Sequence, residues 1–487
     1  MKKSEIAIAY DKTVSRFSRR LPHHDQITEL GVHYFKSGRK DVAAGYFALA
    51  AAMSPNDSNP MNLVGLGTSL QNRGQLRSAV ACFQSALESG GPNPQISSKR
   101  DHCIKEMKPG VDQGELAALR WDTDHYFVGR QGKDLGENGS LVLWVAPFAG
   151  KSGTVTSNLL NTFSEFLEAD VIVMNAWAFG YELDIYPDIC LYCLAVDLAP
   201  DVVFYLNPSL SQSPKNPRLE TISWMRQLTG AALVTLCLDL AKPYYRNAVN
   251  LLAGESDLVV TTDQPAGPEL TARANGRVML GWHVVDTAAF MPRGQDRDID
   301  VSFVGQFHGK NYVSREPFLT HLNDNGVELF LGGSSAGKFL SNDEYADVMR
   351  RSRIALNFSG FAVVSGWDFH PISGCPHRND SEKNHLKARV FEILESGALL
   401  FESENSVITE WFEPGIHYVP FSDKGDLLDK VRYYLTKEDE RQKIAMAGHL
   451  FAREKYTAEK FWHGVFDPLI ASGRFQRLPV WRSAADT

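Results

Sequence analysis

The chain has 487 residues, too many for a single hydrophobic core, so two or three domains are expected. Hydrophobic residues make up 44% and charged residues 22%, an ordinary balance for a globular protein. The formal net charge of −8 argues against nucleic acid or an anionic membrane surface as a general partner, and no apolar run approaches the ~20 residues that span a bilayer.

The start of the chain and its cysteines indicate a reducing environment. Residues 1–24 include basic side chains but lack the apolar core of a secretory signal, and six cysteines are too few for a disulfide framework. Cys190 and Cys193 have the spacing of a metal or redox pair, but they lie in an apolar segment with no second pair nearby, which favours buried thiols. We therefore expect a cytoplasmic protein.

Residues 27–94 contain two copies of one pattern of amphipathic helices, 36 residues apart. Small residues let the helices of a pair approach, and aromatic residues fill the space between them. The pattern resembles the tetratricopeptide repeat, normally ~34 residues long, and predicts an all-α domain over residues 1–125 whose groove binds a peptide or protein. A helical bundle that only packs against an enzyme is the alternative. The recurring positions are Leu30, Gly31, Tyr34, Ala43, Phe47 and Ala50, then Leu66, Gly67, Leu70, Ala79, Phe83 and Ala86.

Residues 140–280 predict a first Rossmann-like domain, because continuous apolar runs alternate with helical stretches, as in a parallel, doubly wound sheet. The strand candidates are residues 140–148, 169–177, 201–208, 231–240, 257–263 and 277–284.

The loop after the first of these strands contains Gly150, Lys151 and Ser152, which look like the end of an ATP-binding P-loop. A P-loop needs an earlier glycine five positions before Gly150, and Val145 stands there as the last residue of the apolar run. We therefore expect this loop to face the cleft between two domains and to contact an acceptor. An ATP- or GTP-using enzyme is the weaker alternative.

The alternation of strands and helices starts again near residue 298, after a linker at 281–297. Residues 281–470 therefore predict a second Rossmann-like domain, followed by a tail at 471–487. The expected fold is α/β, with two Rossmann-like domains preceded by the helical domain. Such a pair of domains forms a cleft at the carboxyl ends of both sheets.

The segment "NHLKARVFEILESGALLFES" carries the sharpest functional signal. It places Lys387, Arg389 and Glu392 at the start of a helix. With "DVSFVGQF", "IALNFSG" and "FEPGIHYVPF", in that order along the chain, it resembles the GT-B glycosyltransferases, in particular the group related to spore maturation proteins. The resemblance implies a nucleotide sugar as donor, no metal and no other cofactor.

The resemblance and the residue chemistry imply a donor site in the second domain. A diphosphate needs cations and a helix N-terminus, and Glu392 stands where this architecture has a glutamate that accepts the ribose hydroxyls. Many retaining members carry a second glutamate eight residues earlier, where this chain has Asn384, so the stereochemical outcome stays open. The predicted donor-binding residues are Gly305, Lys310, Arg315, Asn357, Lys387, Arg389 and Glu392.

An acidic triplet and several candidates for a catalytic base lie outside the predicted donor site. Asp298 and Asp300 form an Asp-x-Asp triplet like the metal site of GT-A enzymes, but they precede the first strand of the second domain and are interpreted as a strand entry. For the catalytic base, the loop after the second strand offers Asp184, with Glu182 and Asp188 beside it, and the domain junction offers His283. Asp184 or His283 is our prediction.

The sequence as a whole predicts a bacterial-type GT-B glycosyltransferase. The helical repeats suggest a protein acceptor, an inference that rests on analogy with other modular enzymes. The alternatives are a glycan or lipid-linked acceptor, and a catalytically silent scaffold.

Overall fold

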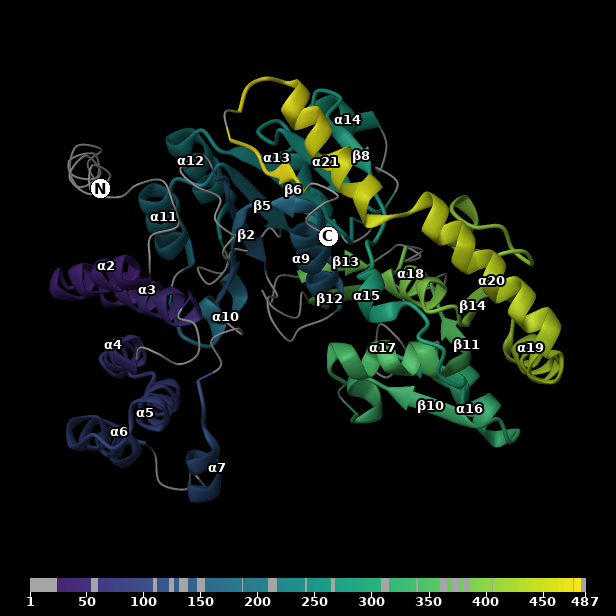
Figure 1. The fold of residues 1–487 in the computed structure, drawn as a ribbon, viewed down its shortest axis with the longest axis horizontal. Coiled ribbons are helices and arrows are strands. Elements are labelled where there is room, and N and C mark those ends of the chain that lie inside the picture. Colours follow the sequence, from purple (N-terminus) through teal and green to yellow (C-terminus); the bar gives the residue numbers. More distant parts are fainter. Residues whose placement is uncertain are drawn as a thin grey trace.

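The computed structural model describes residues 24–53, 60–107, 112–121, 127–130, 139–146, 154–185, 187–208, 217–240, 243–263, 268–307, 315–338, 340–359, 366–369, 376–379, 386–404, 406–475 and 477–482. Within these ranges the chain forms a helical region and two sheet domains (Figure 1). No helix in the ranges given is long and apolar enough to cross a bilayer.

The helical region forms two antiparallel helix pairs where the repeat pattern predicts them. Gly31 allows the two helices of the first pair to approach, because a Cβ at this position would lie only 2.8 Å from the ring of Phe47 on the second helix. Phe47 and Phe83 are both buried at the corresponding position of each copy. The tetratricopeptide nature of the region stays a prediction. The helices are α2 (His24–Lys36), α3 (Lys40–Met53), α4 (Pro60–Gln71), α5 (Leu76–Gly90), α6 (Pro94–Glu106) and α7 (Gln113–Ala118).

Helix α3 packs directly on the first sheet domain, against α11 (Pro187–Leu198). Gly45 lies against the thiol of Cys190, and Tyr34 and Tyr46 both donate hydrogen bonds to the carboxylate of Asp197, the first at 3.1 Å. Burial raises the pKa of the Cys193 thiol to about 12. This end of the helical region therefore shares its core with the first sheet domain, while α4, α5 and α6 extend away from it (Figure 1).

The first sheet has seven strands in the order β1-β4-β2-β5-β6-β7-β8. All pairs are parallel except the edge pair of β1 with β4, and the six predicted strands are all present. The strands are β1 (Phe127–Arg130), β2 (Leu141–Ala146), β4 (Asp170–Asn175), β5 (Val202–Leu206), β6 (Ala232–Cys237), β7 (Leu258–Thr261) and β8 (Val278–Leu280). The helices between them are α9 (Thr154–Phe166), α10 (Ala176–Tyr181), α11, α12 (Leu219–Thr229), α13 (Pro243–Leu252) and α14 (Pro268–Arg273).

The second sheet has five parallel strands in the order β10-β9-β11-β14-β15. A two-stranded hairpin of β12 (Gly366–Phe369) and β13 (Pro376–Asn379) stands within the predicted long loop after β11. The strands of the sheet are β9 (Ile299–Val304), β10 (Leu329–Gly332), β11 (Ser352–Asn357), β14 (Leu399–Ser403) and β15 (Val419–Phe421). Its helices are α15 (Thr287–Phe290), α16 (Glu316–Asp324), α17 (Asn342–Arg351), α18 (Ala388–Glu395), α19 (Lys424–Thr436) and α20 (Glu438–Lys455).

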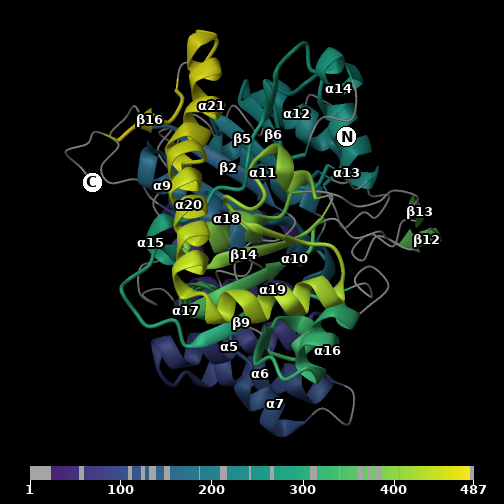
Figure 2. The same cartoon turned by 90° about the vertical axis from the view of Figure 1, so that its right-hand side faces the viewer.

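The end of the chain returns to the first sheet domain. Helix α20 covers the second domain, and α21 (Ala458–Ala471) continues onto the first, where Trp462 and Phe466 are buried against the core of the first sheet (Figures 1 and 2). Strand β16 (Val480–Trp481) then pairs with β3 (Leu167–Glu168). The described residues from 458 onward thus pack on the first domain, whereas the sequence analysis placed residues up to 470 in the second domain and the rest in a tail.

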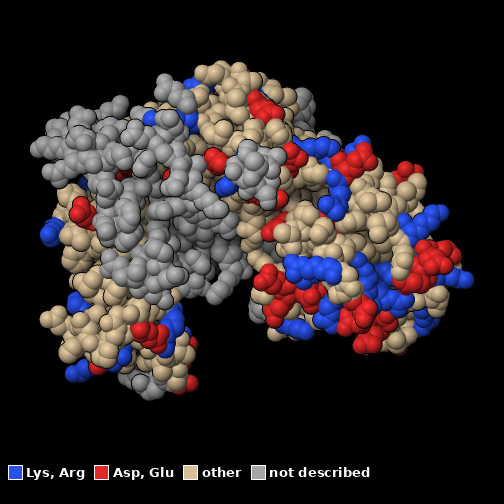
Figure 3. Space-filling model, viewed as in Figure 1, with Lys and Arg blue, Asp and Glu red and all other residues tan. Residues whose placement is uncertain are grey.

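Charged residues of both signs alternate over the second sheet domain (Figure 3). The carboxylates of the Asp-x-Asp triplet are among them: Asp298 pairs with Arg351 at 2.5 Å, and Asp300 pairs with Arg353 at 2.8 Å. These pairs attach the start of β9 to α17 and β11, so both aspartates serve as surface ion-pair partners at the strand entry.

Candidate functional site

The candidate site lies at the carboxyl edge of the second sheet, where parallel strands end together. Gly305 directly follows β9, Asn357 is the last residue of β11, and Glu402 stands beside Asn357 in the neighbouring strand β14. Asn357 and Glu402 are fully buried. Ligands of open α/β sheets bind at this edge, because the loops that leave the strands there can form a crevice.

Helix α18 begins at the same edge and brings Arg389 to it. The Arg389 guanidinium donates from Nη1 to the Asn357 side-chain oxygen at 3.0 Å and stands 5.0 Å from the centre of the Phe303 ring. Gly305 makes this position possible, because a Cβ at residue 305 would overlap Nη2 of Arg389. The Nε of Arg389 is buried and has no hydrogen-bond partner within the described ranges. Arg389 is therefore a cation held at a helix N-terminus, where an anion is favoured.

Glu392, on the same helix, connects the two sheet domains. Its carboxylate is only 2% exposed; it accepts from the Tyr345 hydroxyl at 2.8 Å and from the Asn158 side-chain amide of α9 at 3.2 Å. Burial and the charge of Glu392 raise the pKa of Tyr345, which keeps this hydroxyl protonated as a donor. Asn158 in turn accepts from the backbone N–H of Asp286 in the linker, also at 3.2 Å. Through Asn158, the first domain therefore makes a direct hydrogen bond to Glu392 of the second domain.

His283 lies at the junction between the domains and is 6% exposed. Its Nε2 is 3.3 Å from the carbonyl oxygen of Leu386, which can only accept, so Nε2 carries the proton and Nδ1 is unprotonated. Burial lowers the pKa of His283 to about 4; the nearby Lys387 charge also lowers it, while Asp239 and the bond to Leu386 oppose the shift. Nδ1 is buried without a hydrogen-bond partner in the part of the chain that is described.

The other predicted donor residues have different surroundings. Arg315 is 7% exposed, and its guanidinium donates to the carbonyls of Gln306 and Phe358, at 2.9 and 3.1 Å, so it ties the ends of β9 and β11 together. Lys387 is the residue before α18 and is partly buried. Lys310 lies outside the described residues.

The remaining predicted residues belong to the first sheet domain. Asp184 is exposed, has a left-handed backbone (φ 53°), and accepts at its carbonyl from Arg73 of the helical region. Asp188 is instead buried, and its carboxylate accepts from the backbone and side chain of Arg218, at 2.8 and 3.3 Å. The acceptor-loop residues Gly150, Lys151 and Ser152 lie outside the described residues, directly before α9.

Three residues of this site were not predicted from the sequence: Glu402, Asn158 and Tyr345. The one local signal for Glu402 was a carboxylate inside the apolar run of β14, a position where an unpaired charge would be strongly destabilising. Asn158 and Tyr345 sit on ordinary amphipathic helices, and their bonds to Glu392 span 234 and 47 residues of chain. No local pattern reports such distant pairing. Among the described residues, no group of His, Cys, Asp or Glu side chains could hold a metal ion.

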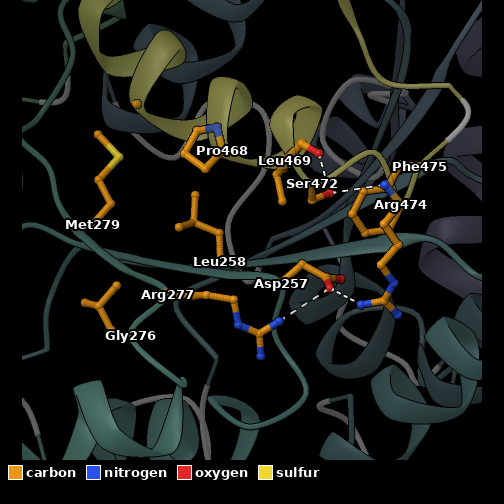
Figure 4. A pocket seen from close by; sticks show the side chains of 12 residues that line it. Asp257, Leu258, Gly276, Arg277, Met279, Pro468, Leu469, Ser472, Arg474 and Phe475 are labelled. Carbon is orange, nitrogen blue, oxygen red and sulfur yellow. Dashed lines mark hydrogen bonds and ion pairs between the residues drawn. The ribbon is translucent and has the colours of Figure 1, made fainter.

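A cavity of about 320 Å³ lies elsewhere, between β7, β8 and α21 (Figure 4). Asp257 lines it and binds Arg226 and Arg474, at 2.9 and 2.6 Å, with Arg277 at 3.7 Å. Because Asp257 precedes β7, the cavity is at the amino edge of the first sheet, whereas ligands of open α/β sheets bind at the carboxyl edge. Its arginines attach α12, β8 and the end of the chain to one carboxylate.

Comparisons of sequence support an enzymatic class. Residues 302–465, from β9 into α21, match the family described as glycosyl transferase-like. A segment of 81 residues is 30% identical to Protein O-glucosyltransferase 2 of Danio rerio, over 15% of this chain and 16% of that protein. The chain thus spans about a sixth of the length of this curated relative.

Comparisons of structure give distant similarities. HepE of Anabaena, in complex with UDP and glucose, is 10% identical, with a TM-score of 0.47 over 68% of this chain and 100% of that chain. Sucrose-phosphate synthase of Thermosynechococcus elongatus is 8% identical, with a TM-score of 0.45 over 68% and 100%. A glycosyltransferase of Rickettsia africae is 11% identical, with a TM-score of 0.43 over 69% and 99%.

Residues 302–465, most of the second sheet domain, thus resemble glycosyltransferases, and the chain has the two Rossmann-like sheets that the sequence predicts. The prediction made from the segment at residues 384–403 is confirmed at this level. The narrower resemblance to the group of spore maturation proteins stays a prediction.

Proposed function

We propose that the chain transfers a sugar from a nucleoside diphosphate sugar, with the donor bound mainly by the second sheet domain. The observation that carries this proposal is the position of Arg389. A fixed guanidinium lies at the N-terminus of α18 and at the carboxyl edge of a parallel sheet, next to a glycine that leaves the backbone open. Charge, helix end and sheet edge all favour a diphosphate.

We propose that the other donor-binding residues surround the Arg389 guanidinium. Lys387, the residue before α18 and two positions before Arg389, adds a second cation, and Glu392 would accept from the ribose hydroxyls. In the present structure one oxygen of Glu392 accepts from Asn158, so ribose would replace that amide as partner. Arg315 would act by holding the ends of β9 and β11, and Lys310 would approach the diphosphate from the loop after β9. No metal is required.

The catalytic base is proposed to be Asp184 or His283, for different reasons. His283 is adjacent to α18 and unprotonated at Nδ1, as a base must be, but a pKa of about 4 makes it a weak one near neutral pH. Asp184 is an exposed carboxylate after β4, in the domain proposed to bind the acceptor. Comparison of kcat for Asp184→Asn and His283→Gln distinguishes them, because only loss of the base lowers kcat by the ~100-fold or more that general base catalysis contributes.

The acceptor is proposed to be a protein recruited by the helical region. The two helix pairs are held firmly by α3 on the first sheet domain, and exposed apolar side chains, Val32 on α2 and Met61 on α4, are available for a partner. The short match to a protein O-glucosyltransferase supports the same kind of acceptor. The loop of Gly150, Lys151 and Ser152 would contact it, since this loop precedes α9 in the chain and α9 brings Asn158 to Glu392. A glycan or lipid-linked acceptor is the alternative.

The proposed donor site is tested by sugar-nucleotide hydrolysis. Purified protein is screened with UDP-, GDP-, CDP- and dTDP-sugars, and the Lys387→Ala and Glu392→Ala variants are compared with Lys424→Ala, a lysine at the start of α19. We expect both site variants to lose at least ~10-fold in kcat/KM, because each loses a charged hydrogen bond, and the control to keep its activity. Activity unaffected by both changes would refute the site. Failure of the wild-type chain to bind any nucleoside diphosphate would favour the silent scaffold.

A further inference from the structure

The buried carboxylate of Glu402 has an unusually complete set of hydrogen-bond donors. Oε1 accepts from the backbone N–H groups of Ser359 and Ser403 and from the Ser403 hydroxyl, each at 2.8 Å. Oε2 accepts from the Asn357 side-chain amide at 2.6 Å and from the Ser359 hydroxyl at 3.0 Å. Backbone N–H groups can only donate, so Oε1 must act as an acceptor, and both partners of Oε2 can donate to it, a set that suits an ionised carboxylate.

This carboxylate and the Arg389 guanidinium together decide which way the Asn357 amide points. The nitrogen of an asparagine amide donates and its oxygen accepts, so the nitrogen must face Glu402. The oxygen then faces the other way, and it accepts from Nη1 of Arg389 at 3.0 Å. If the amide were reversed, a pair of N–H groups would face a guanidinium, and neither group could accept.

Two polar groups orient the Arg389 head group: the Asn357 oxygen accepts from Nη1, and the Tyr345 hydroxyl is a second hydrogen-bond partner. The Phe303 ring lies beneath the guanidinium, and the missing side chain of Gly305 leaves room for it. An aromatic face attracts a cation but lets it rotate in the plane parallel to the ring. A hydrogen bond to Asn357 fixes that rotation, because its geometry is directional. The Asn357 amide thus links the buried Glu402 carboxylate to the guanidinium and holds its Nη1 in place.

We propose that Glu402 is a positioning residue for the donor: through the Asn357 amide it fixes the Arg389 guanidinium in the orientation that receives the diphosphate of a nucleoside diphosphate. The inference rests on the proposed function, since it assumes that Arg389 contacts the donor. Glu402 itself is fully buried behind Asn357 and touches no substrate.

Glu402→Gln is the informative change, because it keeps the shape of the side chain and replaces one acceptor by a donor. Its amide nitrogen would face an N–H donor at either oxygen position, and the Asn357 amide can relieve the conflict only by reversing. The control is Glu404→Gln, an exposed glutamate two residues later. Asn357→Ala is a second variant that removes the connecting amide while leaving Glu402 four of its donors.

The readout is calorimetric binding of UDP and GDP, with UMP and GMP as matched ligands that lack the second phosphate. We expect Glu402→Gln and Asn357→Ala each to weaken the bound diphosphate about tenfold, ~1.4 kcal/mol, and the monophosphate less than threefold. In an Arg389→Met background, the same changes should have no further effect on the diphosphate, because the residues act in series. Glu404→Gln should bind both ligands as the wild type does.

The outcomes separate the two claims. If Arg389→Met weakens the diphosphate but Glu402→Gln and Asn357→Ala do not, or if their effects add to that of Arg389→Met, the positioning role is wrong and the donor site stands. Equal weakening of diphosphate and monophosphate by Glu402→Gln also overturns it, because that pattern reports general damage to the domain. If the wild type binds neither UDP nor GDP, the proposed function fails together with the inference.

Discussion

Replacement of the buried His283 tests the electrostatics of the domain junction. The pKa of His283 is about 4 in the folded protein, below its ordinary value of 6.5, chiefly because burial disfavours the imidazolium. Between pH 6.5 and 4 the unfolded chain therefore binds a proton that the native state does not. Stability is at its full value above pH 6.5 and falls as the pH decreases to 4, by about 3 kcal/mol at ~1.4 kcal/mol per pH unit.

His283→Gln removes the titrating group and keeps a donor for the carbonyl of Leu386. Urea unfolding of the wild type and the variant, measured across this pH range, should give free energies whose difference changes by about 3 kcal/mol, with the variant losing less as the pH falls. The titration of the His283 ring protons by NMR is the second measurement, with a midpoint expected near pH 4. Parallel stability curves, or a midpoint near 6.5, would refute the burial of a neutral imidazole at this junction.

Three further changes test single contacts. Gly305→Ala should displace Arg389 and weaken UDP or GDP at least about threefold, measured by calorimetry, and it should also lower the melting temperature because φ of residue 305 is 158°; unchanged affinity would argue against the close approach. Asn158→Ala should lower the free energy of unfolding by about 2 kcal/mol, since the buried Glu392 loses a donor, and an unaltered urea midpoint would contradict this. Arg297→Met should also destabilise the chain by about 2 kcal/mol, because its guanidinium donates to three backbone carbonyls at 2.6 to 2.9 Å; full stability would show that water replaces it.

The strands could be predicted from the sequence because their signal is local. The apolar run 231–240 contains β6, and the run 140–148 contains β2, since a strand covered on both faces needs consecutive apolar residues. The crossing of α21 onto the first domain could not be predicted in the same way. Its apolar face would suit either sheet, and Trp462 finds its partners some 300 residues earlier, where its indole N–H donates to Thr162.

The candidate site also combines groups that a sequence segment reveals with partners that lie far away in the chain. The helix start with Arg389 and Glu392 was recognisable as a segment, and the structure gives each residue a partner that the segment does not contain. Asn357 is 32 residues from Arg389, and Asn158 is 234 residues from Glu392. A motif thus reports which groups are present, whereas their orientation depends on buried polar partners supplied by the rest of the fold.

The bond between Asn158 and Glu392 has a consequence for how the domains work together. A ribose and the Asn158 amide would compete for the same carboxylate oxygen, so donor binding would release α9 from α18. Asn158 also holds the linker through Asp286, and Asn161 of the same helix donates to the Asp286 carboxylate at 2.8 Å. Helix α9 therefore joins the linker to the Glu392 carboxylate of the second domain, and a loss of the Asn158 amide should loosen both contacts.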